Sequence, residues 1–105
     1  MKRSLGSRST TAIGLGCMNV SHAYGPPLTP EDGARLLDRA LELGYDHFDT
    51  ARIYGAGRNE ELVGRVLKGR RERVFLASKM GIFAEDGRRW IDCRPATIHA
   101  EIDKS

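Results

Sequence analysis

Three side chains of the sequence, Asp49, Tyr54 and Lys79, form a set that can move a proton. A free tyrosine has a pKa of about 10 and is a poor acid at neutral pH. A neighbouring ammonium group stabilises the phenolate, and a carboxylate beside the ammonium keeps it charged and in place. A tyrosine held in this way can give a proton to a carbonyl oxygen while hydride arrives at the carbon. The three residues therefore predict proton-transfer chemistry, provided that the fold brings them together.

Three successive segments follow one plan, in which a short apolar run leads through a glycine-containing loop into an amphipathic helix. The apolar runs predict strands over 12–18, 45–51 and 74–79. This alternation is typical of an α/β fold with parallel strands and crossover helices. Active sites of such folds form at the carboxyl ends of the strands, where Asp49 and Lys79 stand. We therefore expect Asp49, Tyr54 and Lys79 to converge at that rim.

Local signals mark the ends of the helices. Thr29 is expected to cap the first helix, with Pro30 at its first position, and Asn59 to cap the second. Gly44 and Gly69 are expected to end these two helices, and a third begins at Pro95. The apolar faces predicted for the first two helices comprise Ala34, Leu36, Leu37, Ala40, Leu41 and Leu43, then Leu62, Val63, Val66 and Leu67.

Composition favours a soluble globular chain. Of the 105 residues, 40% are hydrophobic and 30% charged, and the net charge is 17 − 14 = +3, too weak to indicate a nucleic-acid partner. No apolar run is long enough for a membrane span, and the polar start does not predict an export signal. Cys17 and Cys93 fit neither a disulfide framework nor a metal site, so we expect reduced thiols and a cytoplasmic location.

The expected fold needs more chain than this sequence provides. Three parallel strands leave two unpaired edges, and parallel sheets normally have both faces covered. A closed (β/α)₈ barrel takes roughly 250 residues. Residues 1–105 are thus expected to be the front portion of a larger domain; a self-contained three-strand domain and a truncated gene product are the alternatives.

Several stretches carry a resemblance to a known family. They are Gly14-Leu15-Gly16-Cys17-Met18, Phe48-Asp49-Thr50-Ala51 with Tyr54-Gly55, Asn59-Glu60-Glu61-Leu62-Val63-Gly64 and Ala77-Ser78-Lys79-Met80-Gly81. In order and spacing the sequence resembles the aldo/keto reductase family from about Leu5 to Ser105. The resemblance implies about the first three β/α units of a (β/α)₈ TIM barrel. It also implies NADPH as cofactor and a small-molecule aldehyde or ketone as substrate.

The resemblance assigns roles to individual residues. Tyr54 would be the general acid, Lys79 the partner that lowers its pKa, and Asp49 the residue that orients Lys79. Cys17 and Met18, together with Asp49, would approach the nicotinamide ribose.

Other features depart from the family pattern. The family's catalytic histidine follows a fourth strand, and His99 in the third helix cannot replace it. The N-terminal hairpin of the family looks shortened around Ser7 to Thr11, and Asn19 stands where glycine is common. For these reasons we expect the 105 residues alone to be inactive.

Several other residues have structural interpretations as well as functional ones. Gly14 to Asn19 is weak as a dinucleotide-binding fingerprint, because no helix is expected to start there. His22 is expected in a solvated loop and His47 in the packed interior, while Trp90, in a polar loop over 85–92, would form a substrate wall or cover the rim. As an alternative function, the same scaffold could serve as a non-catalytic cofactor-sensing or regulatory subunit.

Overall fold

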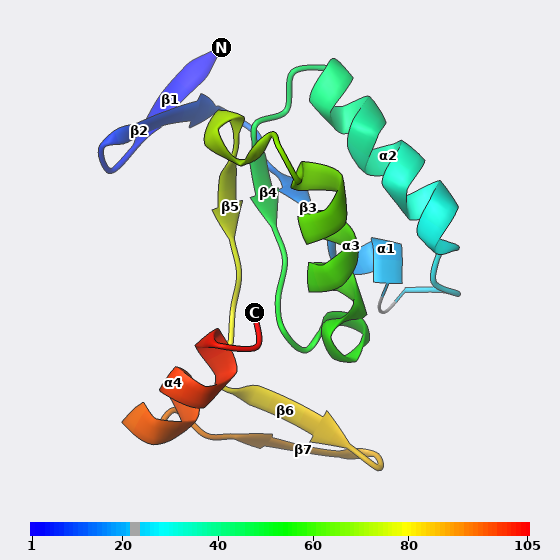
Figure 1. Cartoon of the computed structure of the whole chain (residues 1–105), viewed down its shortest axis with the longest axis vertical. Helices are drawn as coiled ribbons and strands as arrows, with labels where there is room; N and C mark the ends of the chain where they lie inside the picture. The colour runs from blue at the N-terminus through cyan, green and yellow to red at the C-terminus, as the bar shows by residue number, and fades with distance from the viewer. Residues whose placement is uncertain (22–23) are drawn as a thin grey trace.

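A three-stranded parallel sheet forms the centre of the molecule (Figure 1). The computed structural model describes residues 1–21 and 24–105. The strands β3 (Leu15–Gly16), β4 (His47–Asp49) and β5 (Phe75–Ala77) pair in that order. Helices α2 (Pro30–Glu42) and α3 (Arg58–Leu67) pack together against one face of this sheet. The predicted α/β order of strands and crossover helices is confirmed.

Two antiparallel hairpins lie at opposite ends of the sheet (Figure 1). At the amino ends, β1 (Lys2–Leu5) pairs with β2 (Arg8–Thr11). Beyond the carboxyl ends, β6 (Ile82–Glu85) pairs with β7 (Arg88–Ile91), and α4 (Pro95–Ile102) follows. The expectation of a polar loop over 85–92 is therefore wrong. Asp86 and Gly87 both have positive φ, 48° and 75°, and an Asp-Gly pair favours the tight turn of a hairpin.

The first β/α connection also differs from its prediction. The strand expected over 12–18 is paired only at Leu15–Gly16, and a one-turn helix, α1 (Met18–Ser21), follows it. The backbone N–H of Cys17 donates to the Asp49 carbonyl at 2.8 Å, and that of Val20 donates to the Cys17 carbonyl at 3.2 Å. The chain thus turns away from the sheet directly after its last ladder bond, so a short helix does begin there, contrary to expectation.

The start of α2 was predicted correctly and that of α3 was not. Thr29 caps α2, because its side chain accepts from the backbone N–H of Asp32 at 3.1 Å and Pro30 takes the first position. Helix α3 begins at Arg58, after Gly57 with φ 94°. Asn59 therefore lies inside the first turn, and it is fully buried. Two 3₁₀ turns, Tyr54–Gly57 and Arg71–Arg73, flank α3.

The core lies between the sheet and the two long helices. Phe48 on β4 is fully buried. Because successive side chains of a strand point to opposite faces, Phe48 faces the helices while its neighbours His47 and Asp49 face the other side of the sheet. The apolar face of α2 is narrower than predicted, because Leu36 and Leu43 are 41% and 62% exposed. The other buried apolar residues are Cys17, Val20, Leu37, Ala40, Ala51, Leu62, Val63, Leu67 and Val74.

Asp46 fastens the N-terminal hairpin to the start of β4. Its carboxylate accepts from Lys2 Nζ, from the Thr11 backbone N–H at 2.6 Å and from Thr11 Oγ1 at 2.9 Å. Burial alone would raise the pKa of Asp46, but the bonds from Lys2 and Thr11 outweigh it and lower the pKa to about 2. The charged carboxylate is thus favoured by the folded state.

We expect Asp46→Asn to lower the melting temperature at pH 7, and the gap from the unmodified chain to shrink on acidification. A carboxylate with a depressed folded-state pKa stabilises the fold above its unfolded pKa and loses that contribution as pH falls through the folded value. The window here runs from about pH 5 to about pH 2. Thermal unfolding followed by circular dichroism at several pH values measures the gap, and a constant gap across this window would contradict the prediction.

Candidate functional site

The parallel pairing of β4 with β5 brings two opposite charges together. Asp49 lies opposite Ala77 in the register, and Lys79 follows two residues later. Lys79 Nζ forms an ion pair and a hydrogen bond with Asp49 Oδ1, and it donates a second bond to the Thr50 carbonyl oxygen at 2.9 Å. The ammonium is therefore held between a carboxylate and a backbone acceptor at the carboxyl ends of the strands.

A tight turn after β4 brings Tyr54 to the same place. Lys79 Nζ lies 5.4 Å from the centroid of the Tyr54 ring. The turn places Gly55 at φ 60° and Ala56 at φ 56°. A Cβ on Gly55 would lie 3.1 Å from the Ser21 carbonyl oxygen, so the glycine allows this close approach to α1. The structure thus brings together all three residues that the sequence placed at this rim.

The charge of the ammonium is secured by its neighbours. Burial lowers the pKa of Lys79, but the hydrogen bond and the charge of Asp49, with smaller contributions from Tyr54, outweigh it and raise the pKa. The side chains of Lys79 and Asp49 are 51% and 43% exposed, so water screens the pair and the ion pair itself adds little stability. The Lys79 ammonium therefore stays charged at neutral pH, and the half-exposed pair is accessible to a ligand.

The residues expected near a cofactor differ in access. Cys17 is completely buried, and burial, the largest influence, raises the pKa of its thiol to about 11. It therefore stays a neutral thiol at neutral pH. Met18 and Asp49 are only partly buried. This side of the rim thus offers a thioether and a carboxylate to a ligand, and the backbone of Cys17 supports both.

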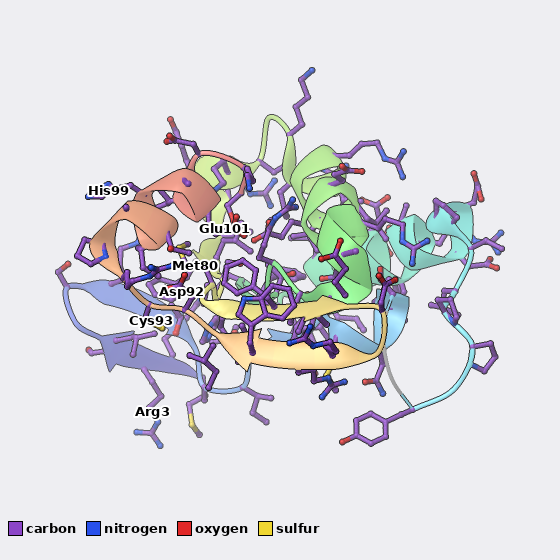
Figure 2. All side chains as sticks on the ribbon, turned by 90° about the horizontal axis from the view of Figure 1, so that it is seen from below. Arg3, Met80, Asp92, Cys93, His99 and Glu101 are labelled. Carbon is purple, nitrogen blue, oxygen red and sulfur yellow. The ribbon has the colours of Figure 1, made fainter. Side chains whose placement is uncertain are left out.

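The other candidate residues lie on β4, on the β6–β7 hairpin and on α4. His47 on β4, expected in the packed interior, is only partly buried and meets the Phe75 ring edge-on, with centroids 5.0 Å apart. Trp90 is 44% exposed and stacks on Phe83 across the β6–β7 hairpin, with centroids 5.4 Å apart. Figure 2 shows His99 on the outer side of α4. His22 lies outside the described residues.

A glycine and an aspartate lie at the base of the β6–β7 hairpin, where the chain leads into α4. In Figure 2 Asp92 and Cys93 lie where the hairpin leads into α4. A Cβ on Gly81 would come within 2.8 Å of Cys93 Sγ, and the Asp92 carboxylate accepts from the Arg94 backbone N–H and from Thr97 Oγ1. Cys17 and Cys93 are both free thiols.

Sequence reasoning missed two polar residues beside the site. The Thr50 carbonyl accepts from Lys79, and Glu60 on α3 accepts from Ser78 Oγ at 2.5 Å, next to Lys79. Glu60 also lies 3.8 Å from Arg52 Nη1 in an ion pair. A backbone acceptor has no sequence signature, and Glu60 looks like an ordinary first-turn helix acid.

Neither a metal centre nor a membrane segment was found in the part of the chain that the structure describes. Over residues 1–21 and 24–105, no group of three or more His, Cys, Asp or Glu side chains could hold a metal ion. Among the same residues, no helix has the length and apolar character needed to cross a bilayer.

Comparison with known proteins gives consistent matches. The model of the Aldo/keto reductase family matches residues 12–105. The aldo-keto reductase yakc [NADP(+)] of Schizosaccharomyces pombe is 37% identical over 107 residues, covering 98% of this chain and 31% of that protein. The uncharacterized oxidoreductase YqkF of Bacillus subtilis is 40% identical over 108 residues, covering 99% of this chain and 33% of that protein.

Solved structures agree with the sequence matches. The aldo-keto reductase AKR11C1 from Bacillus halodurans, in its holo form, superposes with a TM-score of 0.85 at 36% identity, covering 98% of this chain and 34% of that one. The chain therefore spans about a third of the length of these relatives. The expected fold class, about the first three β/α units of an incomplete barrel, is confirmed by this likeness.

Proposed function

Because this chain belongs to the aldo/keto reductase family, we propose that residues 1–105 form the N-terminal part of the barrel domain of an NADPH-dependent carbonyl reductase. The observation that supports this most directly is the Lys79–Asp49 ion pair beside the Tyr54 ring at the strand ends. The proposed substrate is a small aldehyde or ketone. The free thiols Cys17 and Cys93 suit a cytoplasmic setting.

Each of the three residues has a separate task in this reaction. The Tyr54 hydroxyl would donate its proton to the carbonyl oxygen as the carbon is reduced. The Lys79 ammonium would stabilise the phenolate that this transfer leaves. Asp49 would hold the ammonium in place and keep it charged, in line with the raised pKa of Lys79.

The residues at the rim fit one part of the cofactor. NADPH supplies the hydride when it is bound. The partly exposed Asp49 carboxylate is a suitable acceptor for a ribose hydroxyl, and Met18 offers an apolar contact beside it. Cys17, which precedes Met18 and is fully buried, would fix the backbone next to Met18. These residues would hold the nicotinamide ribose and leave the rest of the dinucleotide to other segments.

A hybrid enzyme tests the proposal. It joins this chain to the part of the Bacillus halodurans reductase AKR11C1 that the chain does not match, and gel filtration with circular dichroism shows whether it folds. We expect a folded hybrid to oxidise NADPH in the presence of an aldehyde, measured at 340 nm. A folded hybrid that binds NADPH without turnover would favour the alternative, a cofactor-sensing or regulatory subunit.

For the 105-residue chain by itself we predict no turnover and no NADPH binding in the micromolar range. The contacts that we assign to the cofactor, from Asp49, Met18 and the backbone near Cys17, are few, and a few contacts do not offset the entropy lost on binding. Isothermal titration calorimetry of the chain with NADPH is the measurement. A micromolar dissociation constant would show that the rim holds far more of the cofactor than we assign to it.

A further inference from the structure

Asn59 is a fully buried polar side chain with hydrogen-bond partners on both ends of its carboxamide. Its Oδ1 accepts from Thr50 Oγ1 at 2.5 Å, and its Nδ2 donates to the Cys17 carbonyl at 2.8 Å and to Ser21 Oγ at 3.1 Å. Burying an amide without such partners is unfavourable, because its polar atoms would lose their hydrogen bonds to water without replacement. The complete set of bonds explains how a polar residue occupies the inward face of α3.

The three partners belong to three different segments around the candidate site. Cys17 follows β3, Ser21 ends α1, and Thr50 follows β4. Two further bonds connect these segments to the charged pair: Thr50 supplies the carbonyl that Lys79 Nζ bonds at 2.9 Å, and the Cys17 N–H donates to the Asp49 carbonyl at 2.8 Å. The Asn59 carboxamide therefore bonds directly to the two residues that hold the charged pair. Thr50 holds Lys79 through its carbonyl, and Cys17 holds the backbone of Asp49 through its N–H.

We infer that Asn59 is a positioning residue of the proposed reductase site, which fixes the ends of β3 and β4 so that Asp49 and Lys79 meet beside Tyr54. The inference rests on the proposed function and extends it to a side chain that touches neither substrate nor cofactor. A carboxamide is suited to the task because it accepts at one end and donates twice at the other. A carboxylate at position 59 would set an oxygen against the Cys17 carbonyl. A leucine would remove the acceptor that Thr50 Oγ1 uses and the carboxamide donor to the Cys17 carbonyl, which would then keep the Val20 N–H.

The test compares Asn59→Leu with Val63→Ala in the hybrid enzyme. Both changes disturb the buried face of α3, but Val63 makes none of the bonds that lead to the site. We expect Asn59→Leu to lower kcat by about 10- to 100-fold, because small displacements of catalytic groups have effects of that size. KM for the aldehyde and the NADPH dissociation constant should stay near their original values, and Val63→Ala should keep kcat even where its loss of melting temperature is equal.

A spectroscopic measurement on the 105-residue chain tests the same inference without turnover. We expect Asn59→Leu to shift the Asp49 carboxyl ¹³C signal and the Lys79 Nζ signal in NMR spectra, and Val63→Ala to leave both in place. This readout decides the question if the hybrid variant does not fold.

The outcomes separate the two proposals. An inactive but folded unmodified hybrid contradicts the proposed function, whatever the variants do. An active hybrid in which Asn59→Leu retains kcat, or loses no more than Val63→Ala does, overturns the positioning role and leaves the proposed function standing. Unchanged Asp49 and Lys79 signals in the Asn59→Leu chain overturn it as well.

Discussion

Replacing Tyr54 with Phe should reduce hydride transfer in the hybrid enzyme by about 10²- to 10⁴-fold, the range by which a positioned general acid accelerates such reactions. The substitution removes one hydroxyl and keeps the ring, which lies 5.4 Å from Lys79 Nζ. NADPH binding should persist, because Met18 and Asp49 are untouched. Initial rates at 340 nm measure the loss, and quenching of protein fluorescence by NADPH measures binding.

A second tyrosine serves as the control for that substitution. Tyr45 precedes β4 and packs against the hydrophobic core, away from the Lys79 ammonium. Tyr45→Phe should therefore leave kcat unchanged while it alters the same functional group. Full turnover in Tyr54→Phe would remove the tyrosine from the reaction and with it the assigned role of Lys79.

Local signals in the sequence predicted the features that depend on a few neighbouring residues. Thr29 with Pro30 marked the start of α2, because capping needs only an oxygen three residues before the N–H that it accepts from. The ends of the short apolar runs placed Asp49 and Lys79 at strand ends, and the predicted parallel pairing brought those ends to one rim, where the two side chains do meet. The fold class and the charged pair could thus be inferred without coordinates.

Features that depend on distant partners could not be inferred. Asn59 looks like a helix cap, and nothing near it reveals that its amide reaches Cys17, 42 positions away.

The Asp86-Gly87 turn, in contrast, carried a readable hairpin signal, but the charged residues around it suggested a solvated loop. Stacking of Phe83 on Trp90 across the hairpin supplies the apolar contact that makes these two short strands pair.

Replacing Lys79 with Met should lower kcat of the hybrid enzyme by about 10²- to 10⁴-fold, measured from initial rates at 340 nm. The ammonium carries a raised pKa through Asp49, so it remains charged throughout the neutral range. Without that charge the phenolate formed by proton transfer is less stable, so proton transfer to the carbonyl oxygen is slower.

A conservative variant and a control variant accompany this prediction. Lys79→Arg keeps the charge but spreads it over a planar group that cannot reproduce both the Asp49 and the Thr50 contacts of an ammonium, so an intermediate loss of kcat is expected. Lys68→Met removes an exposed charge just after α3 and should leave kcat unchanged. If Lys79→Met kept the kcat of the unmodified hybrid, the ammonium would have no part in proton transfer, and the Asp49–Lys79 pair would serve only to join β4 to the segment after β5.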